Sequence, residues 1–408
     1  MEFGVFIPSA NNGWLVSESA PQYLPTFAHN KEIVLLAERH GLEFALSMVK
    51  MRGYGGPTRY WDYSLDSFTL MAALAAVTER IRLFASAPIL ALEPAVAARM
   101  ATTIDSVAPG RFGINIVTGW QAAEFEQMGV WPGAEHYRRR YDYAGEYVTI
   151  LRQLFETGMS DFKGEFFTYD DCRLLPAPSA PITVVGAGQS DRGIRFCAEH
   201  GDVNFVAAEG RNTPTAFAAT AERVLAAAAQ TGREVGVYVL VMIIAAEADD
   251  EAWARWHGYE DGVDVEALTW MTSQSSLDTV HRDADRSSVQ LMTKLAATKA
   301  VNQGLGALIG SYASVAGMLD EMAAVPGVTG IMLVCDDFVR GIGDFGERIQ
   351  PLLACRADRV RRRPGRPDSA QVRGSPARYS RVSARETTSA YRSARSQSAA
   401  SREKVRGS

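Results

Sequence analysis

The sequence has few of the residues that define disulfide-rich or zinc-binding proteins. Its four cysteines, Cys172, Cys197, Cys335 and Cys355, are widely spaced and form no C-x-x-C pair. This spacing argues against a disulfide framework and is typical of a protein in a reducing cytoplasm. The six histidines form neither H-x-x-x-H nor H-E-x-x-H, so the sequence predicts no metal site.

Apolar runs long enough to cross a bilayer are also missing. The longest run, VGVYVLVMIIAA from Val235, has 12 residues, whereas a spanning helix needs about 20. The chain opens with EFGVFIP, without the basic region and long apolar run of a signal peptide. We therefore expect a cytoplasmic protein that does not enter a membrane.

Common catalytic signatures are absent as well. The sequence contains no G-x-S-x-G, no Walker loop and no obvious nucleophile–His pair. If the protein is an enzyme, its chemistry is then expected to reside in a bound cofactor. The protein would supply position, electrostatics and exclusion of water.

Charge divides the chain into an acidic body and a basic tail. Residues 356–408 contain 15 Lys and Arg against 4 Asp and Glu, whereas residues 1–355 contain 27 against 43. The tail is dominated by Arg, Ser and Ala and lacks apolar periodicity, so we predict that it is disordered. Its arginines suit nucleic-acid binding, but a solvated extension is the simpler interpretation, and we expect no nucleic-acid partner.

Strand-like and helix-like segments alternate through residues 1–355, which we interpret as one domain. Eight such βα units are typical of a (β/α)8 TIM barrel. A doubly wound open sheet is the main alternative, but the first strand ends in PSANNG, which is not its usual glycine fingerprint. The predicted strands are 2–8, 44–49, 81–89, 111–117, 181–188, 202–208, 235–245 and 330–338, and the predicted helices are 27–41, 65–80, 94–110, 136–158, 190–201, 214–232 and 311–327.

Three segments are too long to be simple connections. Residues 9–27 and 50–64 follow the first two strands and are rich in Asn, Gly, Pro, Tyr and Trp. In a barrel they would lie on the C-terminal, catalytic face. Residues 256–305 form a partly helical insertion before the last βα unit, of a kind that often forms a pocket wall.

Polar residues at two strand ends suggest a pocket. Asn115 lies among apolar residues near the end of the strand 111–117, and Trp120 and Glu124 follow it. A buried amide can simply bond neighbouring backbone, but here a flat apolar ring and a carboxylate come next. Lys50 ends the strand FALSMVK, where it is either a solvated charge or a group facing an anionic ligand.

Two further segments could bind a phosphate. Arg140 and Tyr141 lie near the start of a predicted helix. The alternative is that these residues form a basic surface turn. The strand VVG continues into AGQSD, where glycines precede a helix that Ser190 would cap. An ordinary βα turn with a serine cap is the alternative for this second segment.

Taken together, these stretches resemble the bacterial luciferase-like family of flavin-dependent monooxygenases, and within it the enzymes that act on pyrimidines. The resemblance runs from Met1 to about Arg356, and NIVTGWQ, RRYDY and AGQSD in this order are its most specific part. It is also carried by NNGW, APQYLPTF, FALSMVKMRGYGG, SFTLMAALAAVTERI, ARMATTIDS, GRFGINIVTGWQ, EQMGVWPG, SDFKGEFFT, NTPTAFA, GSYASVA and FGERIQPL.

The resemblance implies a TIM barrel of the luciferase-like type that uses reduced FMN (FMNH2) with O2 as co-substrate. Ser86 stands where the family pattern has Thr, which keeps the hydroxyl and loses a methyl group. The implied FMN contacts are Val49, Lys50, Asn115, Glu124, Arg140, Tyr141 and Ser190. The implied surroundings of O2 are Leu46, Ser86 and Asn115, and Lys50 and Trp120 complete the set of expected catalytic residues.

The implied reaction opens the ring of uracil or thymine between N3 and C4 and gives a ureidoacrylate peracid. A separate NADH-dependent flavin reductase would supply FMNH2, and the enzyme is expected to be a homo-oligomer. A sister monooxygenase acting on an alkanesulfonate, an alkane or another small organic molecule is the nearest alternative. A flavin-binding barrel without turnover and a nucleic-acid-associated protein are more distant alternatives.

Overall fold

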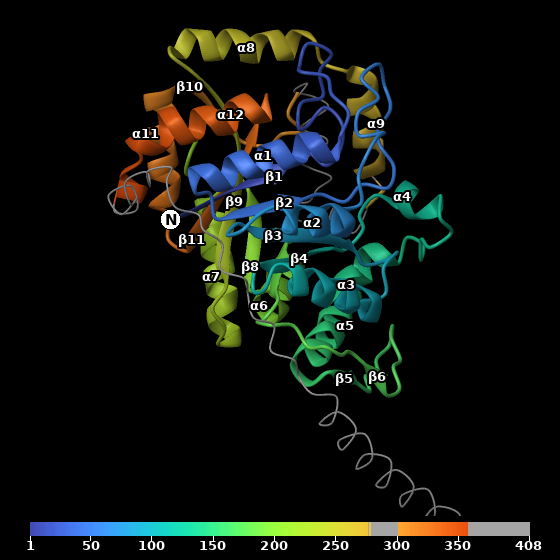
Figure 1. Ribbon diagram of the computed structural model, residues 1–408. Coiled ribbons are helices and arrows are strands. Elements are labelled where there is room, and N and C mark those ends of the chain that lie inside the picture. Colours follow the sequence, from blue (N-terminus) through green and yellow to red (C-terminus); the bar gives the residue numbers. More distant parts are fainter. Residues whose placement is uncertain (276, 279–300, 358–408) are drawn as a thin grey trace, which may run out of the picture. The chain divides into compact units, whose positions relative to one another are not determined.

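Eight parallel strands close into a barrel in the computed structural model, which describes residues 1–275, 277–278 and 301–357 (Figure 1). The ring closes because the first strand pairs with the last, and the seventh with the sixth. This confirms the TIM barrel and excludes the open sheet. The barrel strands are β1 (Glu2–Ile7), β2 (Phe44–Ser47), β3 (Arg82–Pro88), β4 (Phe112–Val117), β7 (Thr183–Gly186), β8 (Val203–Ala207), β9 (Gly236–Ala246) and β11 (Val328–Cys335).

Helices surround the barrel, and several of them begin at capping residues that the sequence supplies. The side chains of Thr26, Asp66, Ser190 and Ser311 each accept a hydrogen bond from a backbone N–H in the first turn of the helix that follows. The helices are α1 (Phe27–His40), α2 (Ser67–Ala75), α3 (Pro94–Val107), α4 (Ala122–Glu126), α5 (His136–Thr157), α6 (Asp191–His200), α7 (Ala218–Thr231), α8 (Asp249–Asp261), α9 (Val265–Ser275), α11 (Tyr312–Ala323) and α12 (Phe338–Asp344), followed by a π-helix (Phe345–Ile349) and two 3-10 turns (Gln350–Leu352 and Ala354–Arg356).

The sheet also contains a ninth strand, β10 (Ala307–Ser311), that the sequence analysis missed. It pairs in parallel with the second half of β9, from Met242 to Ala246, while the first half of β9 pairs with β8. It has five residues and stands directly before the predicted helix 311–327, so a short strand–helix pattern was present but was not used. A small antiparallel pair, β5 (Met159–Ser160) with β6 (Cys172–Arg173), was also not predicted.

Several predicted boundaries were wrong by a few residues. The predicted helix 65–80 ends at Ala75, and the predicted strand 330–338 spans Val328–Cys335 instead. The predicted strand 181–188 shrinks to four residues, because the chain leaves the sheet at Gly186 to form the turn before α6. Boundaries are the weakest part of a periodicity argument, since apolar residues continue into the adjoining turns.

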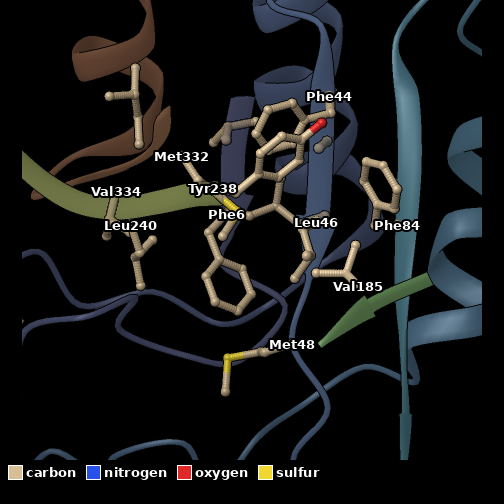
Figure 2. Packing of buried hydrophobic residues seen from close by; sticks show 14 of the residues in the cluster. Phe6, Phe44, Leu46, Met48, Phe84, Val185, Tyr238, Leu240, Met332 and Val334 are labelled. Atoms are coloured by element: carbon tan, nitrogen blue, oxygen red, sulfur yellow. The ribbon is translucent and has the colours of Figure 1, made fainter. Parts of the chain in front are cut away.

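Three aromatic rings fill the amino-terminal end of the barrel interior (Figure 2). Phe44 stacks on Tyr238 with ring centroids 4.4 Å apart, and Phe84 meets Phe44 edge to face at 6.0 Å. Each ring faces a glycine on the neighbouring strand, in the register pairs Gly4–Phe44, Gly113–Phe84 and Gly330–Tyr238. A Cβ atom at these glycines would lie 2.3, 2.4 and 2.8 Å from the facing ring, so the missing side chains make room for the rings.

We expect Gly4→Ala to destabilise the protein by about 2 kcal/mol, because the new methyl group must displace the fully buried Phe44 ring. Gly258→Ala is the matched control, since Gly258 lies in α8 with nothing within 4 Å of the added Cβ atom. There alanine should stabilise the helix by about 0.5–1 kcal/mol. Urea denaturation of both variants measures the difference, and equal stabilities would contradict this account of the ring layer.

Long connections gather at the carboxyl ends of the strands, as predicted. The segments after β1 and β2 are joined by a hydrogen bond from Asn11 N to Tyr63 O, 3.0 Å long. The segment after β1 also bonds the insertion, through Val16 N to Val301 O at 2.7 Å. Asp264, at the start of α9, accepts hydrogen bonds from both the backbone and the hydroxyl of Thr58. These contacts form one wall above the mouth of the barrel.

The predicted insertion 256–305 takes in the end of α8 and all of α9, and its residues 276 and 279–300 lie outside the described residues. The predicted disordered tail also lies outside them, except for Arg356 and Ala357. Arg356 is buried, pairs with Glu43 at 2.7 Å and donates to Gly41 O. No helix within the described ranges is long and apolar enough to cross a membrane.

Candidate active site

A cavity of about 370 Å³ opens at the carboxyl ends of the barrel strands. Its walls come from the segments that follow β1 to β4 and β7, from the start of α5, and from the turn before β10. This is the face on which TIM barrels place their active sites. The lining residues are Trp14, Met48, Val49, Lys50, Tyr54, Trp61, Pro88, Ile116, Val117, Thr118, Gly119, Trp120, Glu124, Phe125, Arg140, Tyr141, Ala187, Gly188, Phe196 and Gln303.

A buried ion pair lies in the wall of this cavity. The Lys50 ammonium contacts the Glu124 carboxylate, and their side chains are only 4% and 9% exposed. The other Glu124 oxygen accepts a hydrogen bond from the Met51 backbone at 2.9 Å. Glu124 lies in the short helix α4, so the pair fastens the segment after β4 to the end of β2. The sequence analysis predicted both residues for the site but not that they touch.

Lys50 uses all three of its N–H donors within the protein. Besides Glu124, they point at Tyr54 Oη, 3.0 Å away, and at Gln121 Oε1. Burial alone would lower the pKa of Lys50, but Tyr54 and Glu124 outweigh it and raise the pKa above its ordinary value. The ammonium therefore stays charged at neutral pH and also faces the Trp120 ring at 5.5 Å.

Asn115 belongs to a buried hydrogen-bonded network and is not part of the cavity lining, although the next residue, Ile116, is. Its Nδ2 donates to Ser86 Oγ at 2.8 Å, and Ser86 Oγ donates to Ser47 O at 2.7 Å. Among the described residues, Asn115 Oδ1 is buried and accepts no hydrogen bond. A buried acceptor without a partner is costly, so it points to a ligand that would donate to it.

Leu46 and Ser86, predicted beside O2, are both buried inside the barrel and are not part of the cavity lining. Figure 2 shows Leu46 among the interior side chains, beyond the ring layer. Ser86 accepts from Asn115 and its backbone N–H donates to Ser67 Oγ at 2.7 Å. In this structure the Ser86 hydroxyl orients Asn115.

The two segments predicted to bind phosphate come together in the wall of the cavity. Arg140 and Tyr141, on α5, line it together with Gly188 from the turn after β7. A Cβ atom at Gly193 would lie 2.6 Å from both Gly188 Cα and Tyr141 Oη, so glycine allows this close approach. Ser190 caps α6, as predicted, by accepting from Gly193 N at 3.2 Å, but it does not line the cavity.

Arg140 has an anionic neighbour that the sequence analysis missed. Its Nη1 lies 3.1 Å from Asp278 Oδ2, and the two side chains are 6% and 1% exposed. Asp278 belongs to the insertion, more than 130 residues further along the chain, and no motif surrounds it. The Asp278 carboxylate binds the Arg140 guanidinium in the way that a phosphate oxygen would.

A histidine fixes the turn that carries Trp120. The His136 Nε2 atom lies 2.7 Å from Thr118 O. Burial lowers the pKa of His136, so its ring is neutral at pH 7, and the nitrogen facing a carbonyl must be the protonated one. The hydrogen bond joins the first residue of α5 to the end of β4 and holds the 118–120 segment at the cavity.

Sequence reasoning also missed Gln121, Tyr54 and Gln303 as site residues. Gln121 stands in the quoted motif GRFGINIVTGWQ, so its place beside Trp120 was a usable signal. Tyr54 lies four residues after Lys50 in a segment already expected on the catalytic face. Gln303 follows the insertion, where no periodicity or motif marks it.

The chain is similar to known proteins over most of its length. A family model described as luciferase-like monooxygenase matches residues 1–329. The pyrimidine monooxygenase RutA of Escherichia coli O127:H6 (strain E2348/69 / EPEC) is 58% identical over 357 residues, which are 88% of this chain and 97% of that protein.

Solved structures show the same fold at low identity. Riboflavin lyase (RcaE), crystallised with modified FMN and riboflavin, has a TM-score of 0.75 at 19% identity and covers 88% of this chain and 92% of its own. EDTA monooxygenase (EmoA) from Chelativorans sp. BNC1 has a TM-score of 0.71 at 17% identity, over 88% and 94%. These likenesses support the barrel architecture alone.

Proposed function

The chain belongs to the luciferase-like monooxygenase family and is a monooxygenase, and from this premise we propose that it acts on pyrimidines with a flavin cofactor. In this proposal it uses FMNH2 and O2 to open uracil or thymine between N3 and C4, giving ureidoacrylate peracid. The observation that carries the proposal is the 58% identity to a pyrimidine monooxygenase over 97% of that protein. A separate NADH-dependent flavin reductase would supply FMNH2 in the cytoplasm, and the enzyme would be a homo-oligomer.

The residues of the cavity fit FMN. Arg140, Tyr141 and the backbone around Gly188 would hold its phosphate, at the N-terminus of α6. The Asn115 Oδ1 atom, buried and without a partner among the described residues, would accept from an N–H of a bound ligand. Val49 and Trp120 offer apolar surface for a flat ring. When bound and reduced, FMN supplies the electrons that activate O2.

The protein itself would position the reactants, stabilise developing charge and exclude water from the cavity. Trp14, Trp61 and Trp120 line the cavity and exclude water, which strengthens every electrostatic interaction inside it. Lys50 stays protonated beside Glu124 and would favour negative charge that develops on a pyrimidine oxygen. Its three donors are already used, so Lys50 acts through its charge unless the ligand displaces Tyr54 or Gln121.

The direct test is an anaerobic mixture of the protein, FMNH2 and uracil, followed by an oxygen pulse and mass analysis of the products. We expect uracil to disappear only after oxygen is added and to give the ring-opened peracid. Thymine should give the methyl analogue, and an alkanesulfonate should be left intact. No oxygen-dependent loss of uracil would overturn the proposal, and turnover of the alkanesulfonate would favour a sister enzyme.

We expect Asp278→Asn to tighten FMN binding by a factor of about five, because the carboxylate competes with the phosphate for Arg140. Fluorescence titration of oxidised FMN measures the dissociation constant. Asp250→Asn, on the exposed first turn of α8, is the control for the change in net charge and should have no effect. Weaker binding to Asp278→Asn would show instead that Asp278 holds Arg140 in its working position.

A further inference from the structure

The turn before β10 places one side chain in the cavity at a conformational cost. Gln303 has a φ of 58°, in the left-handed region that favours glycine, and Gly304 follows with a φ of 73°. Non-glycine residues in this region carry strain of a kind that concentrates at functional sites. The chain nevertheless has a long polar side chain at this position, and that side chain lines the cavity.

Hydrogen bonds hold this turn in place on both sides. Val301 O accepts from Val16 N at 2.7 Å, and Leu305 N donates to Asn302 O at 3.1 Å. The Asn302 side chain closes the turn by donating to Leu305 O. The backbone that carries Gln303 is therefore held in place by hydrogen bonds, one of which joins it to the segment that follows β1.

The orientation of the Gln303 amide follows from its partner, Tyr60. The Tyr60 hydroxyl donates to Gly13 O at 3.1 Å, so its oxygen can only accept from Gln303, whose Nε2 faces it. A flipped amide would set two acceptors against each other. The Nε2 atom is thus fixed toward Tyr60, and among the described residues no hydrogen bond reaches Gln303 Oε1.

We propose that Gln303 is a specificity-determining residue whose Oε1 accepts a hydrogen bond from a ring N–H of the pyrimidine substrate. This inference rests on the proposed function. Uracil carries ring N–H donors beside carbonyl acceptors, and a carboxamide offers the complementary acceptor and donor. Tyr60 is the positioning residue that fixes which of the two faces the substrate.

The place of Gln303 favours the substrate over the cofactor. Its anchors follow β1 and β2, whereas Gly188 and Ser190 follow β7. In the strand order β1-β2-β3-β4-β7-β8-β9-β11 of the closed ring, β1 and β7 lie across the barrel from each other. Gln303 thus contacts the cavity from the side opposite the proposed phosphate site.

Gln303→Met tests the assignment, because it keeps the length of the side chain and removes its hydrogen-bonding groups. We expect KM for uracil to rise about tenfold with kcat changed less than about threefold, since one uncharged hydrogen bond is lost. The dissociation constant of FMN should not change. Wild type should discriminate between uracil and at least one of N1-methyluracil and N3-methyluracil, and Gln303→Met should lose that discrimination. Gln230→Met, on the exposed surface of α7, should match wild type in all three measurements.

Two further variants separate recognition from a structural role. Gln303→Gly relieves the left-handed strain, so its melting temperature should equal or exceed that of wild type while KM for uracil rises as in Gln303→Met. Tyr60→Phe frees the amide to flip and should raise KM by a smaller factor.

The outcomes of these measurements distinguish failure of the Gln303 assignment from failure of the proposed function. Uracil turnover that Gln303→Met leaves unchanged, or a loss of FMN affinity in that variant, would overturn the assignment alone. A Gln303→Gly variant that keeps the wild-type KM for uracil would also overturn it. Absence of uracil turnover in wild type would overturn the proposed function, and the assignment with it.

Discussion

Replacing Glu124 by Gln should destabilise the protein by about 3 kcal/mol at neutral pH. The substitution leaves the Lys50 ammonium buried without its counter-charge, and a side chain that is 4% exposed cannot recover its hydration. Tyr54 and Gln121 still accept hydrogen bonds, but neither carries a charge at neutral pH. Urea denaturation at pH 7 measures the loss, and turnover should fall with it because the wall of the cavity loses its tie to α4.

The pH dependence of stability should change sign in this variant. In wild type the folded pKa of Lys50 is raised, so its contribution is complete below the ordinary lysine pKa and is lost as the pH rises through the folded value. In Glu124→Gln, burial dominates and should lower the folded pKa below the unfolded one. The unfolded state then binds more protons, and the stability of the variant should increase between pH 7 and about pH 10 relative to wild type.

A double variant provides the control for this interpretation. Lys50→Met combined with Glu124→Gln removes both charges and should recover part of the lost stability, because a neutral pair has no uncompensated buried charge. Recovery would identify the buried ammonium as the source of the loss. A double variant less stable than Glu124→Gln alone would show that the packing of these side chains, and not their charge, determines the effect.

Asn115→Ala should lower kcat about 100-fold while weakening FMN binding less than about tenfold. Asn115 is oriented by Ser86 and keeps one N–H and its Oδ1 for bound groups, so its removal affects the reacting region more than the phosphate site. Single-turnover kinetics with FMNH2 and uracil, beside FMN titration, separate the two effects. Equal losses in both would show that Asn115 only binds the cofactor.

Ser86 supplies the matched controls for Asn115. Ser86→Thr keeps the hydroxyl that accepts from Asn115 and should stay close to wild type in kcat. Ser86→Ala removes that acceptor, so the amide should lose its fixed orientation and kcat should fall by a smaller factor than in Asn115→Ala. A Ser86→Ala variant with wild-type kcat would contradict the orienting role of this hydroxyl.

The barrel could be predicted because the strand–helix patterns that indicate it lie within short stretches of sequence. Each apolar strand with its following helix occupies a short stretch of sequence, and the cap at Ser190 could be read from a single residue. β10 was missed although it directly precedes the predicted helix 311–327, and its pairing with the second half of β9, beyond the end of β8, is a tertiary feature that the sequence does not mark.

The site residues also divide into those that a local sequence pattern marks and those that only tertiary packing brings together. Lys50, Trp120 and Glu124 could be placed at the barrel mouth because they follow strands, and all three line the cavity. The contact between Lys50 and Glu124 joins residues 74 positions apart, and the pairing of Arg140 with Asp278 depends on how the insertion folds back. Such partners are fixed by tertiary packing, which leaves no periodic trace in the sequence.

The aromatic layer of Phe44, Phe84 and Tyr238 has a consequence for the order of events at the enzyme. It fills the barrel at its amino-terminal end, so ligands are expected to reach the cavity from the carboxyl-terminal face. Ligands would then pass the segments above the strand ends both when they bind and when they leave. In the proposed reaction, if the pyrimidine lies between FMN and the carboxyl-terminal face, the product would have to leave before the flavin is exchanged, and product release would then limit how fast a flavin reductase could resupply the protein.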